Sequence, residues 1–142
     1  MSFGRHRSSL PAAGTLLAAL LLGQVGEAKP PSALQGKLLS AAGTGPILRT
    51  REKDYPLSAK TSYLLHTLQD TRLNGRNVRL EGREESDGRF QVERLYTVRE
   101  CKLYRVRYYC EVCNIEALEP GSCVCCQQPT ELQELPLTKP DK

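Results

Sequence analysis

The sequence has little histidine, the residue that most often serves in acid–base catalysis. It contains two histidines, and one of them, His6, lies in an N-terminal segment that we expect to be removed. The other, His66, lies among leucines, with no nucleophile or acid partner identifiable around it, which favours a structural histidine over a catalytic one. Neither a phosphate-binding loop nor a nucleophile motif is present. We therefore expect a protein that is not an enzyme.

Positive charge is missing from the C-terminal part of the chain. Residues 110–137 contain five glutamates and no lysine or arginine, whereas residues 72–109 contain ten basic and six acidic residues. The formal net charge of +4 is too small to imply nucleic acid as a partner by itself. A basic body is therefore followed by an acidic tail that carries most of the cysteines.

The N-terminus is typical of a secretory signal peptide. Arg5 and Arg7 precede an apolar run from Leu10 to Val25 that holds no acidic residue. Gly26 and Ala28 fit the small-x-small cleavage pattern. We expect residues 1–28 to be removed and the protein to be exported, to the periplasm or the extracellular space. The alternative is an uncleaved membrane anchor, which is the one membrane contact that the sequence suggests.

Three later runs alternate between apolar and polar residues, as half-buried strands do: 77–83, 89–99 and 103–109. A five-residue loop over 84–88 would place Gly82 opposite Phe90. A three-residue loop over 100–102 would pair Val98 with Tyr104, whereas a two-residue turn would bring arginines of the last run inward.

The resulting meander has an apolar inner face, and the charged Arg94 is predicted to fall on it. A bulge in the strand, or stacking of the guanidinium on a tyrosine, would explain this position. The predicted inner face consists of Val78, Leu80, Phe90, Val92, Tyr96, Val98, Tyr104, Val106 and Tyr108.

Earlier residues supply shorter elements. Strands are predicted over 34–39, 47–51 and 55–60, and a helix over 64–73, capped by Thr61 or Ser62 and ended by Asn74-Gly75. A strand over 63–67 is the alternative to the helix start.

Residues 34–99 resemble the small oligonucleotide/oligosaccharide-binding (OB) barrel, including exported bacterial versions with a Gly-x-x-Val-x-Leu-x-Gly stretch like Gly75 to Gly82. The expected fold class is mainly β: a small OB-like barrel or meander with one short helix over 29–109, followed by a C-terminal cysteine knuckle.

Five of the six cysteines fall between Cys110 and Cys126, in two Cys-x-x-Cys knuckles separated by a short loop. Pro120-Gly121 supplies a tight turn before the second knuckle. Four thiolates from two such knuckles can close a tetrahedral shell around Zn²⁺. Structural disulfides are the alternative in an oxidising compartment, and a thiol-disulfide catalyst is a third reading, although the first knuckle ends a strand instead of starting a helix. Vicinal cysteines bridge badly and five clustered cysteines cannot all pair, which favours metal.

This segment resembles the heavy-metal-binding domain that accompanies copper and heavy-metal efflux proteins, and more broadly a minimal zinc ribbon. The resemblance rests on Tyr109-Cys110-x-x-Cys113, Pro120-Gly121-x-Cys123-x-x-Cys126 and Leu132. It implies a module over 110–135, followed by a flexible tail over 136–142. The family has a histidine at the position of Cys113 and a methionine after the last cysteine, and the all-thiolate set here suits structural Zn²⁺ or Cu(I). The implied ligands are Cys110, Cys113, Cys123 and Cys126.

The other two cysteines are predicted to lie outside the ligand set. A strand over 103–109 would hold Cys101 roughly 30 Å from Cys110, so Cys101 is expected to be an exposed turn residue. Cys125 would either point outward or compete with Cys123 for the metal.

The outer face of the meander is the predicted ligand surface, with Leu95 and Tyr109 beside its arginines. These are Arg79, Arg83, Arg89, Arg99, Arg105 and Arg107. Glu81 and Glu93 are interleaved, and we expect Arg79 to pair with Glu93 across strands, so a solvated, salt-bridged face is favoured over a nucleic-acid platform. An anionic polysaccharide, a protein or the chain's own glutamate-rich tail remain open as partners.

These observations predict an exported, non-catalytic binding or structural module with a four-cysteine metal site, occupied by Zn²⁺. One alternative is a periplasmic metal-handling protein that binds Cu(I) or Zn²⁺ exchangeably. Another is a disulfide-stapled interaction module.

Overall fold

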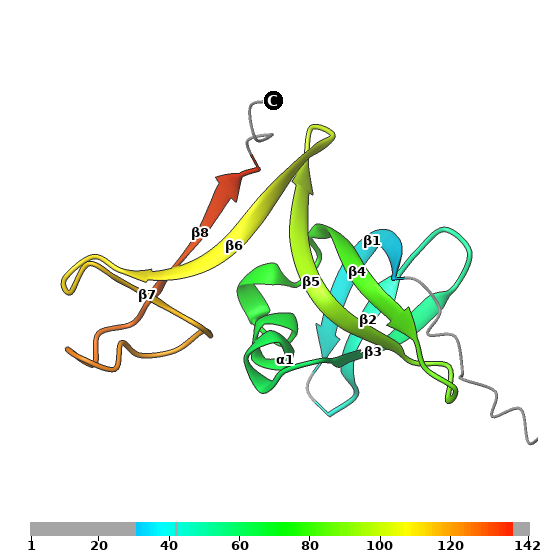
Figure 1. Cartoon of the computed structure of the whole chain (residues 1–142), viewed down its shortest axis with the longest axis horizontal. Coiled ribbons are helices and arrows are strands. Elements are labelled where there is room, and N and C mark those ends of the chain that lie inside the picture. The colour runs from blue at the N-terminus through cyan, green and yellow to red at the C-terminus, as the bar shows by residue number, and fades with distance from the viewer. Residues whose placement is uncertain (1–30, 42, 138–142) are drawn as a thin grey trace, which may run out of the picture.

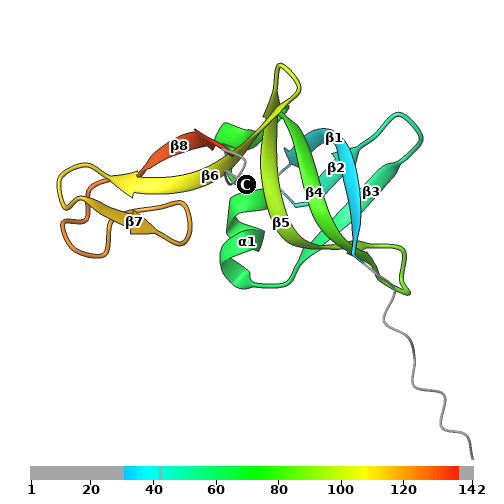
Figure 2. The ribbon, with the colours of Figure 1, turned by 45° about the horizontal axis from the view of Figure 1, so that its top comes forward.

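A computed structural model describes residues 31–41 and 43–137, and the expected signal peptide lies outside these described residues, as do residues 138–142. The described part of the chain forms eight strands, one α-helix and one 3-10 helix (Figures 1 and 2). The expectation of a mainly β chain with one short helix is therefore confirmed. In these two ranges, none of the helices has the length and apolar character needed to cross a membrane.

Five strands close into a barrel. These are β1 (Ser32–Ala41), β2 (Gly45–Arg49), β3 (Asp54–Ala59), β4 (Asn77–Glu84) and β5 (Phe90–Arg99). They pair antiparallel in the order β3-β2-β1-β4-β5. The barrel closes because β3 also pairs in parallel with β5, with Leu57 opposite Phe90 and Ala59 opposite Val92. The three strands predicted upstream are thus present, with ends shifted by a few residues.

The barrel encloses one apolar core, to which the helical segment contributes. The buried core residues are Leu38, Leu48, Leu57, Leu68, Leu73, Val78, Leu80, Phe90, Val92 and Leu95. Helix α1 (Ser62–Leu68) lies beside β3 and β5 (Figure 1). It starts where the Thr61 hydroxyl accepts a hydrogen bond from the N–H of Leu64, as predicted for an N-cap.

The helix is shorter than predicted, and the strand alternative over 63–67 is wrong. Asp70 takes an extended conformation and caps a separate 3-10 turn, η1 (Thr71–Leu73), because its carboxylate accepts the N–H of Arg72. Leu68, the last residue of α1, and Leu73, the last residue of η1, are both fully buried.

The register predicted for the β4–β5 hairpin is wrong by two residues. Phe90 lies opposite Glu84, and Gly82 lies opposite Val92. The ladder then shifts at a bulge, where Glu81 pairs with Arg94. A Cβ at Gly82 would lie 1.9 Å from the Gln91 carbonyl oxygen, so this close crossing of two strands requires glycine.

The bulge reverses the parity of the rest of β5. Arg94 is exposed as a result, so its predicted place on the core face is wrong, and the bulge accounts for it. Leu95 and Thr97 are buried, whereas Tyr96 and Val98 are only half-buried. The predicted positions of Leu95 on the outer face, and of Tyr96 and Val98 on the inner one, are therefore wrong.

The loop predicted for the next hairpin is also wrong, for the same reason. β5 and β6 (Lys102–Cys110) are joined by a two-residue turn, with Val98 opposite Leu103. Both turn residues, Glu100 and Cys101, have positive φ, of 49° and 60°, as a type I′ turn requires. A two-residue turn was disfavoured because it would bring arginines inward, but the parity change in β5 removes that conflict.

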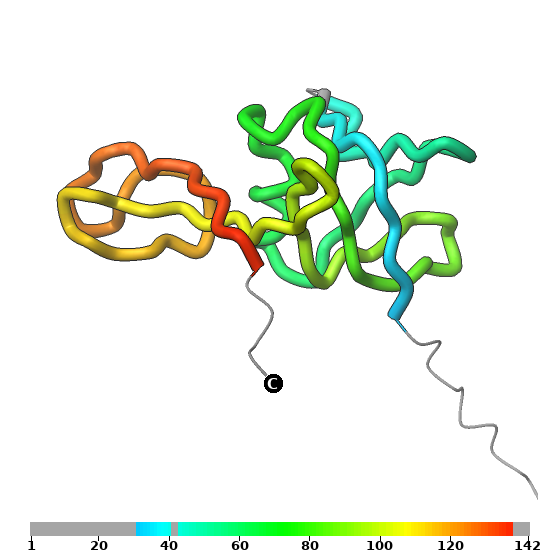
Figure 3. The backbone as a smooth tube through the Cα atoms, turned by 90° about the horizontal axis from the view of Figure 1, so that it is seen from above, coloured from blue at the N-terminus to red at the C-terminus, as the bar shows by residue number. Residues whose placement is uncertain are grey.

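Strand β6 leaves the barrel and extends the same sheet outward. On one edge, Lys102 to Arg105 pair with β5, and Tyr108 to Cys110 pair with β7 (Ile115–Ala117). On the other edge, Tyr104 to Tyr109 pair with β8 (Glu131–Pro136). In Figure 3 this part of the sheet and its loops project from one side of the barrel. We call residues 106–135 the cysteine module. A single continuous strand thus connects it to the barrel.

A buried polar network fixes the module against the barrel. The hydroxyl of Tyr108, on β6, donates a 2.9 Å hydrogen bond to Asp70, and both residues are buried. Arg72 pairs with the same carboxylate at 2.9 Å and donates to the Thr130 carbonyl at 3.1 Å. Burial alone would raise the pKa of Asp70, but the hydrogen bonds from Arg72 and Tyr108 lower it below its ordinary value. Asp70 therefore stays ionised between its two partners.

The acidic tail makes a second contact with the basic body through Glu134, on β8. Its carboxylate lies 2.9 Å from Arg76 and 3.4 Å from Arg99, and its side chain is 8% exposed. Burial would raise its pKa, but the nearby Thr97 hydroxyl and the two guanidinium charges lower it. The acidic tail and the basic body thus form ion pairs with each other within one chain.

We predict that Tyr108→Phe lowers the free energy of unfolding by about 1–3 kcal/mol at pH 7, because a buried carboxylate loses one hydrogen-bond donor. The pKa of Asp70 is lowered in the folded state, so its contribution is present above its ordinary pKa of 3.8 and is lost as the pH falls through the folded value. The difference between variant and wild type should therefore narrow in acid. Urea denaturation from pH 7 to pH 3 measures it, with Tyr63→Phe on the exposed side of α1 as the control. An equal loss in both variants would contradict the network.

Candidate metal centre

The first knuckle begins where β6 ends. Cys110 is the last residue of β6, and its sulfur accepts hydrogen bonds from the backbone N–H groups of Val112 and Cys113. These bonds fold the chain into a tight turn before β7. Asn114, the residue after Cys113, adopts a left-handed conformation with φ of 57°, and the Tyr109 hydroxyl donates a hydrogen bond to its side-chain oxygen.

The second knuckle repeats this conformation. The sulfur of Cys123 accepts hydrogen bonds from the backbone N–H groups of Cys125 and Cys126, and the following residue, Gln127, has φ of 61°. The N–H of Gln127 bonds back to the Cys123 carbonyl at 3.0 Å. Two turns of the same kind therefore present two cysteines each, and in each turn backbone N–H groups donate to the sulfur of the first cysteine.

The structure brings all four predicted ligands together. The sulfurs of Cys110, Cys113, Cys123 and Cys126 lie within 4.8 Å of one another. Those of Cys110 and Cys126 are 3.5 Å apart. Four sulfurs at about 2.3 Å from a tetrahedral Zn²⁺ lie roughly 3.8 Å apart, so a metal ion fits between the knuckles with little rearrangement. Cys110 and Cys123 are buried, and Cys113 and Cys126 are half-buried.

The pKa values of three of these thiols are shifted, and not all in the same direction. Hydrogen bonds from the N–H groups of Cys126 and Cys125 lower the pKa of Cys123 to about 7, against the effect of burial. The N–H of Cys113 acts in the same sense on Cys110, but burial and the neighbouring thiols outweigh it and raise the pKa of Cys110. The thiols of Cys125 and Cys126, followed by burial, raise the pKa of Cys113. A metal ion must therefore displace protons from several thiols, so its affinity rises with pH.

The other two cysteines lie outside this group. Cys101 is exposed at the tip of the β5–β6 turn, at the opposite end of β6 from Cys110, as predicted. Cys125 is also exposed, in agreement with the expected outward orientation, and it is not one of the four cysteines whose sulfurs lie within 4.8 Å of one another.

The predicted arginine face is occupied largely by ion pairs. Arg83 pairs with Glu93 at 2.6 Å, and Arg79 pairs with Glu81 at 3.7 Å, so the predicted Arg79–Glu93 pair is wrong. Arg105 bonds to Glu116 in the cysteine module at 2.7 Å. His66 contacts Glu119, another residue of that module. These contacts agree with a solvated, salt-bridged face.

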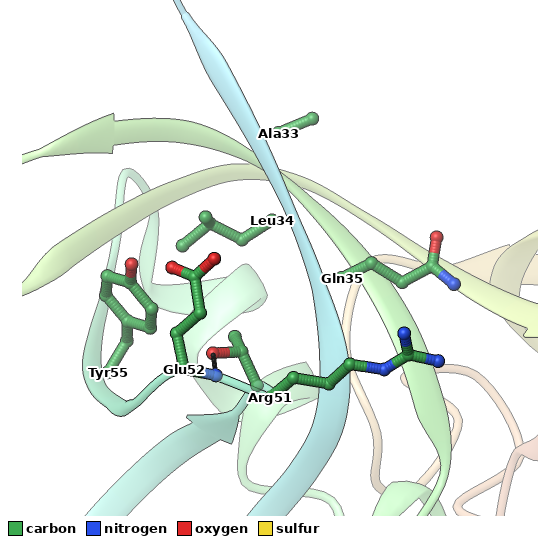
Figure 4. Close-up of a pocket in the computed structure, with 7 residues that line it drawn as sticks. Ala33, Leu34, Gln35, Arg51, Glu52 and Tyr55 are labelled. Carbon is green, nitrogen blue, oxygen red and sulfur yellow. Dashed lines mark hydrogen bonds between the residues drawn. The ribbon is translucent and has the colours of Figure 1, made fainter.

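The barrel also has a cleft of about 470 Å³ beside β1 and β3, remote from the cysteines. Figure 4 shows Glu52 on the same side of β1 as Leu34 and Tyr55, whereas Arg51 and Gln35 extend to the other side. Arg51 and Glu52, which have opposite charges, both line this cleft, so the charge of its walls does not favour an anionic ligand.

The comparisons with known proteins give no relatives. No family model matches the chain, and no curated protein or solved structure matches it significantly. The metal centre therefore rests on its geometry and on the chemistry of its donor set.

We predict that Gln127→Gly increases metal affinity about two- to fivefold. A left-handed conformation costs a non-glycine residue roughly 1–2 kcal/mol, and glycine avoids this cost. Glycine also has more chain entropy to lose on folding, which cancels about half of that gain. Gln128→Gly is the matched control, because Gln127 has positive φ and Gln128 does not. Competition with a chromogenic chelator measures both variants. Equal weakening of binding in the two variants would contradict the knuckle geometry.

Proposed function

We propose that the protein is an exported, non-catalytic binding module in which Cys110, Cys113, Cys123 and Cys126 hold one structural Zn²⁺. The observation that carries this proposal is the convergence of four sulfurs from two turns of the same conformation. When bound, the ion would cross-link the two knuckles. Four thiolates fill a tetrahedral shell and leave no open position for substrate, which supports a structural role over a catalytic one.

The barrel supports assignment to the OB class. Its five strands, its parallel closure of β3 on β5 and its helical segment between β3 and β4 agree with the small Greek-key barrel that this class forms. Export is supported by the sequence pattern of residues 1–28. Topology and sequence together support an exported domain with a metal-stapled appendage.

The module also offers a surface on which a partner could bind. Val112 and Val124 project from the two knuckles with exposed fractions of 74% and 84%, and Leu118 between them in sequence is 73% exposed. A cleft of about 410 Å³ joins Leu118 and Val124 to Tyr63 on α1. Exposed apolar side chains gathered in this way are typical of interaction sites. The metal would hold these loops in position.

An exchangeable Cu(I) or Zn²⁺ site is the second candidate function. The partial exposure of Cys113 and Cys126 favours it, because an incoming ligand can reach them. A structural site and an exchangeable site differ in the rate at which the metal dissociates, and this rate is low in a structural site.

Replacement of any one of the four ligands by serine should weaken zinc binding by more than about a hundredfold, since even an outer-shell partner is worth about 10–100-fold. Cys101→Ser and Cys125→Ser are the matched controls and should retain one equivalent. Native mass spectrometry of the mature chain, prepared under reducing conditions, measures the metal content.

Three other results would each have a definite meaning. Retention of zinc in all four serine variants would contradict the site. A mass lower by pairs of hydrogens, without metal, in the mature chain isolated without reductant would select the disulfide-stapled alternative. Exchange of bound zinc with an isotope within minutes would select the metal-handling alternative.

A further inference from the structure

Helix α1 and the cysteine module enclose a groove between them. A cleft of about 410 Å³ lies between Tyr63 of α1 and the loop from Leu118 to Val124, and a second cleft of about 250 Å³ adjoins it, because Tyr63 and Leu118 line both. Figures 1 and 2 show α1 and the segment after β7 on the same side of β6. The second cleft is also lined by Leu95 of β5 and Val106 of β6. Together the two clefts form one elongated groove, which we call the helix–module groove.

The exposed apolar side chains of the molecule gather in this groove. Five large apolar residues of the described ranges are exposed, and three of them, Tyr63, Leu118 and Val124, line the groove. The other two, Val112 and Leu137, line neither cleft. Exposed apolar surface concentrated in one place is typical of a binding site, and tyrosine is enriched at such interfaces.

The charged side chains that line the groove are all acidic. Glu93 lines the smaller cleft, Glu116 and Glu119 line the larger one, and among the described residues that line either cleft none is lysine or arginine. Glu93 and Glu116 also pair with arginines, and Glu119 contacts a histidine. An ionised carboxylate offers about four acceptor positions, so each of the three can accept a further donor from a bound chain.

The cysteine module adds negative charge around this groove. Residues 110–137 contain five glutamates and no basic residue. Cys123, one of the proposed ligands, lines the larger cleft, and four thiolates outweigh the two positive charges of Zn²⁺ when the ion is bound. The groove therefore combines apolar walls with a negative potential, which favours a cationic partner and repels an anionic one.

We propose that the helix–module groove binds an extended segment of another protein, one that carries apolar side chains with lysine or arginine beside them. The apolar side chains pack on Tyr63, Leu118 and Val124, and the cations pair with the glutamates of the groove. The elongated shape, from β5 to the second knuckle, suits an extended peptide. This inference deepens the proposed function and rests on it, because the bound zinc holds the wall that leads into the second knuckle.

The test starts with random peptides of about twelve residues, displayed on phage and selected on the reduced mature chain supplied with zinc. The selected peptides should combine apolar residues with lysine or arginine. A fluorescein-labelled copy of the most enriched peptide should bind at least about tenfold more weakly to Leu118→Ser by fluorescence anisotropy, since loss of a central contact commonly has an effect of this size. Val112→Ser is the matched control and should bind as wild type, because Val112 is equally exposed in the same module but lies outside the groove.

The charge requirement is tested with the same peptide. Glu119→Gln should weaken its binding about two- to fivefold at low salt and less at high salt, because a partly exposed ion pair is weak and screened. Glu100→Gln removes an exposed glutamate from the β5–β6 turn, outside the groove, and should leave the affinity unchanged.

Three results would overturn the inference: no enriched peptide, enrichment of acidic peptides, or equal binding to Leu118→Ser and Val112→Ser. Self-association of the wild-type chain that Leu118→Ser abolishes would also overturn it, because a second copy would then occupy the groove. Native mass spectrometry would still find one zinc per chain in each case. A chain that binds the basic peptide through Leu118 but holds no zinc would instead overturn the proposed metal site and leave the groove in place, so the two failures are distinguishable.

Discussion

The structure depends on one strand that belongs both to the barrel and to the cysteine module. β6 starts as the partner of β5 in the barrel wall and ends at Cys110, the first cysteine of the candidate metal centre. The bond from Tyr108 to the buried carboxylate of Asp70 fixes the strand where it crosses between the two. Arg72 extends this link to Thr130, which in turn bonds to Gly121 just before the second knuckle. Both knuckles are thus positioned by contacts that originate in the barrel.

The charge pattern serves the same purpose. The net charges of the basic body and the acidic tail suggest an external partner. In the folded chain, however, Glu116 and Glu134 pair with arginines and Glu119 contacts a histidine of the same molecule. Exposed pairs of this kind each contribute little to stability, and for the nearly buried carboxylate of Glu134 the cost of removing its charge from water offsets part of the attraction. The side chains at the tips of the two knuckles, Val112 and Val124, are by contrast apolar and exposed.

Much of the fold and the centre of the site could be predicted from the sequence. Alternation located the strands, Thr61 located the helix start, and the cysteine spacing located the four sulfurs that the structure gathers. The bulge at the Glu81–Arg94 pair could not be predicted, because it accompanies the close approach of Gly82 to β5, a tertiary contact. For this reason Leu95 is predicted on the wrong face and the turn between β5 and β6 is predicted with the wrong length. The register at the β4–β5 loop is a separate error, because Phe90 already lies opposite Glu84 before the bulge. The left-handed residues Asn114 and Gln127 follow the second cysteine of each knuckle, and this symmetry was a signal that sequence reasoning missed.

The central claim is that two like knuckles form one all-sulfur site. X-ray absorption at the zinc K-edge tests it most directly, because it counts the atoms bound to the metal without depending on the rest of the fold. The account predicts a first shell of four sulfurs at about 2.3 Å. A shell that contains nitrogen or oxygen in place of one or more sulfurs, or a chain prepared with reduced thiols that retains no zinc to measure, would contradict it.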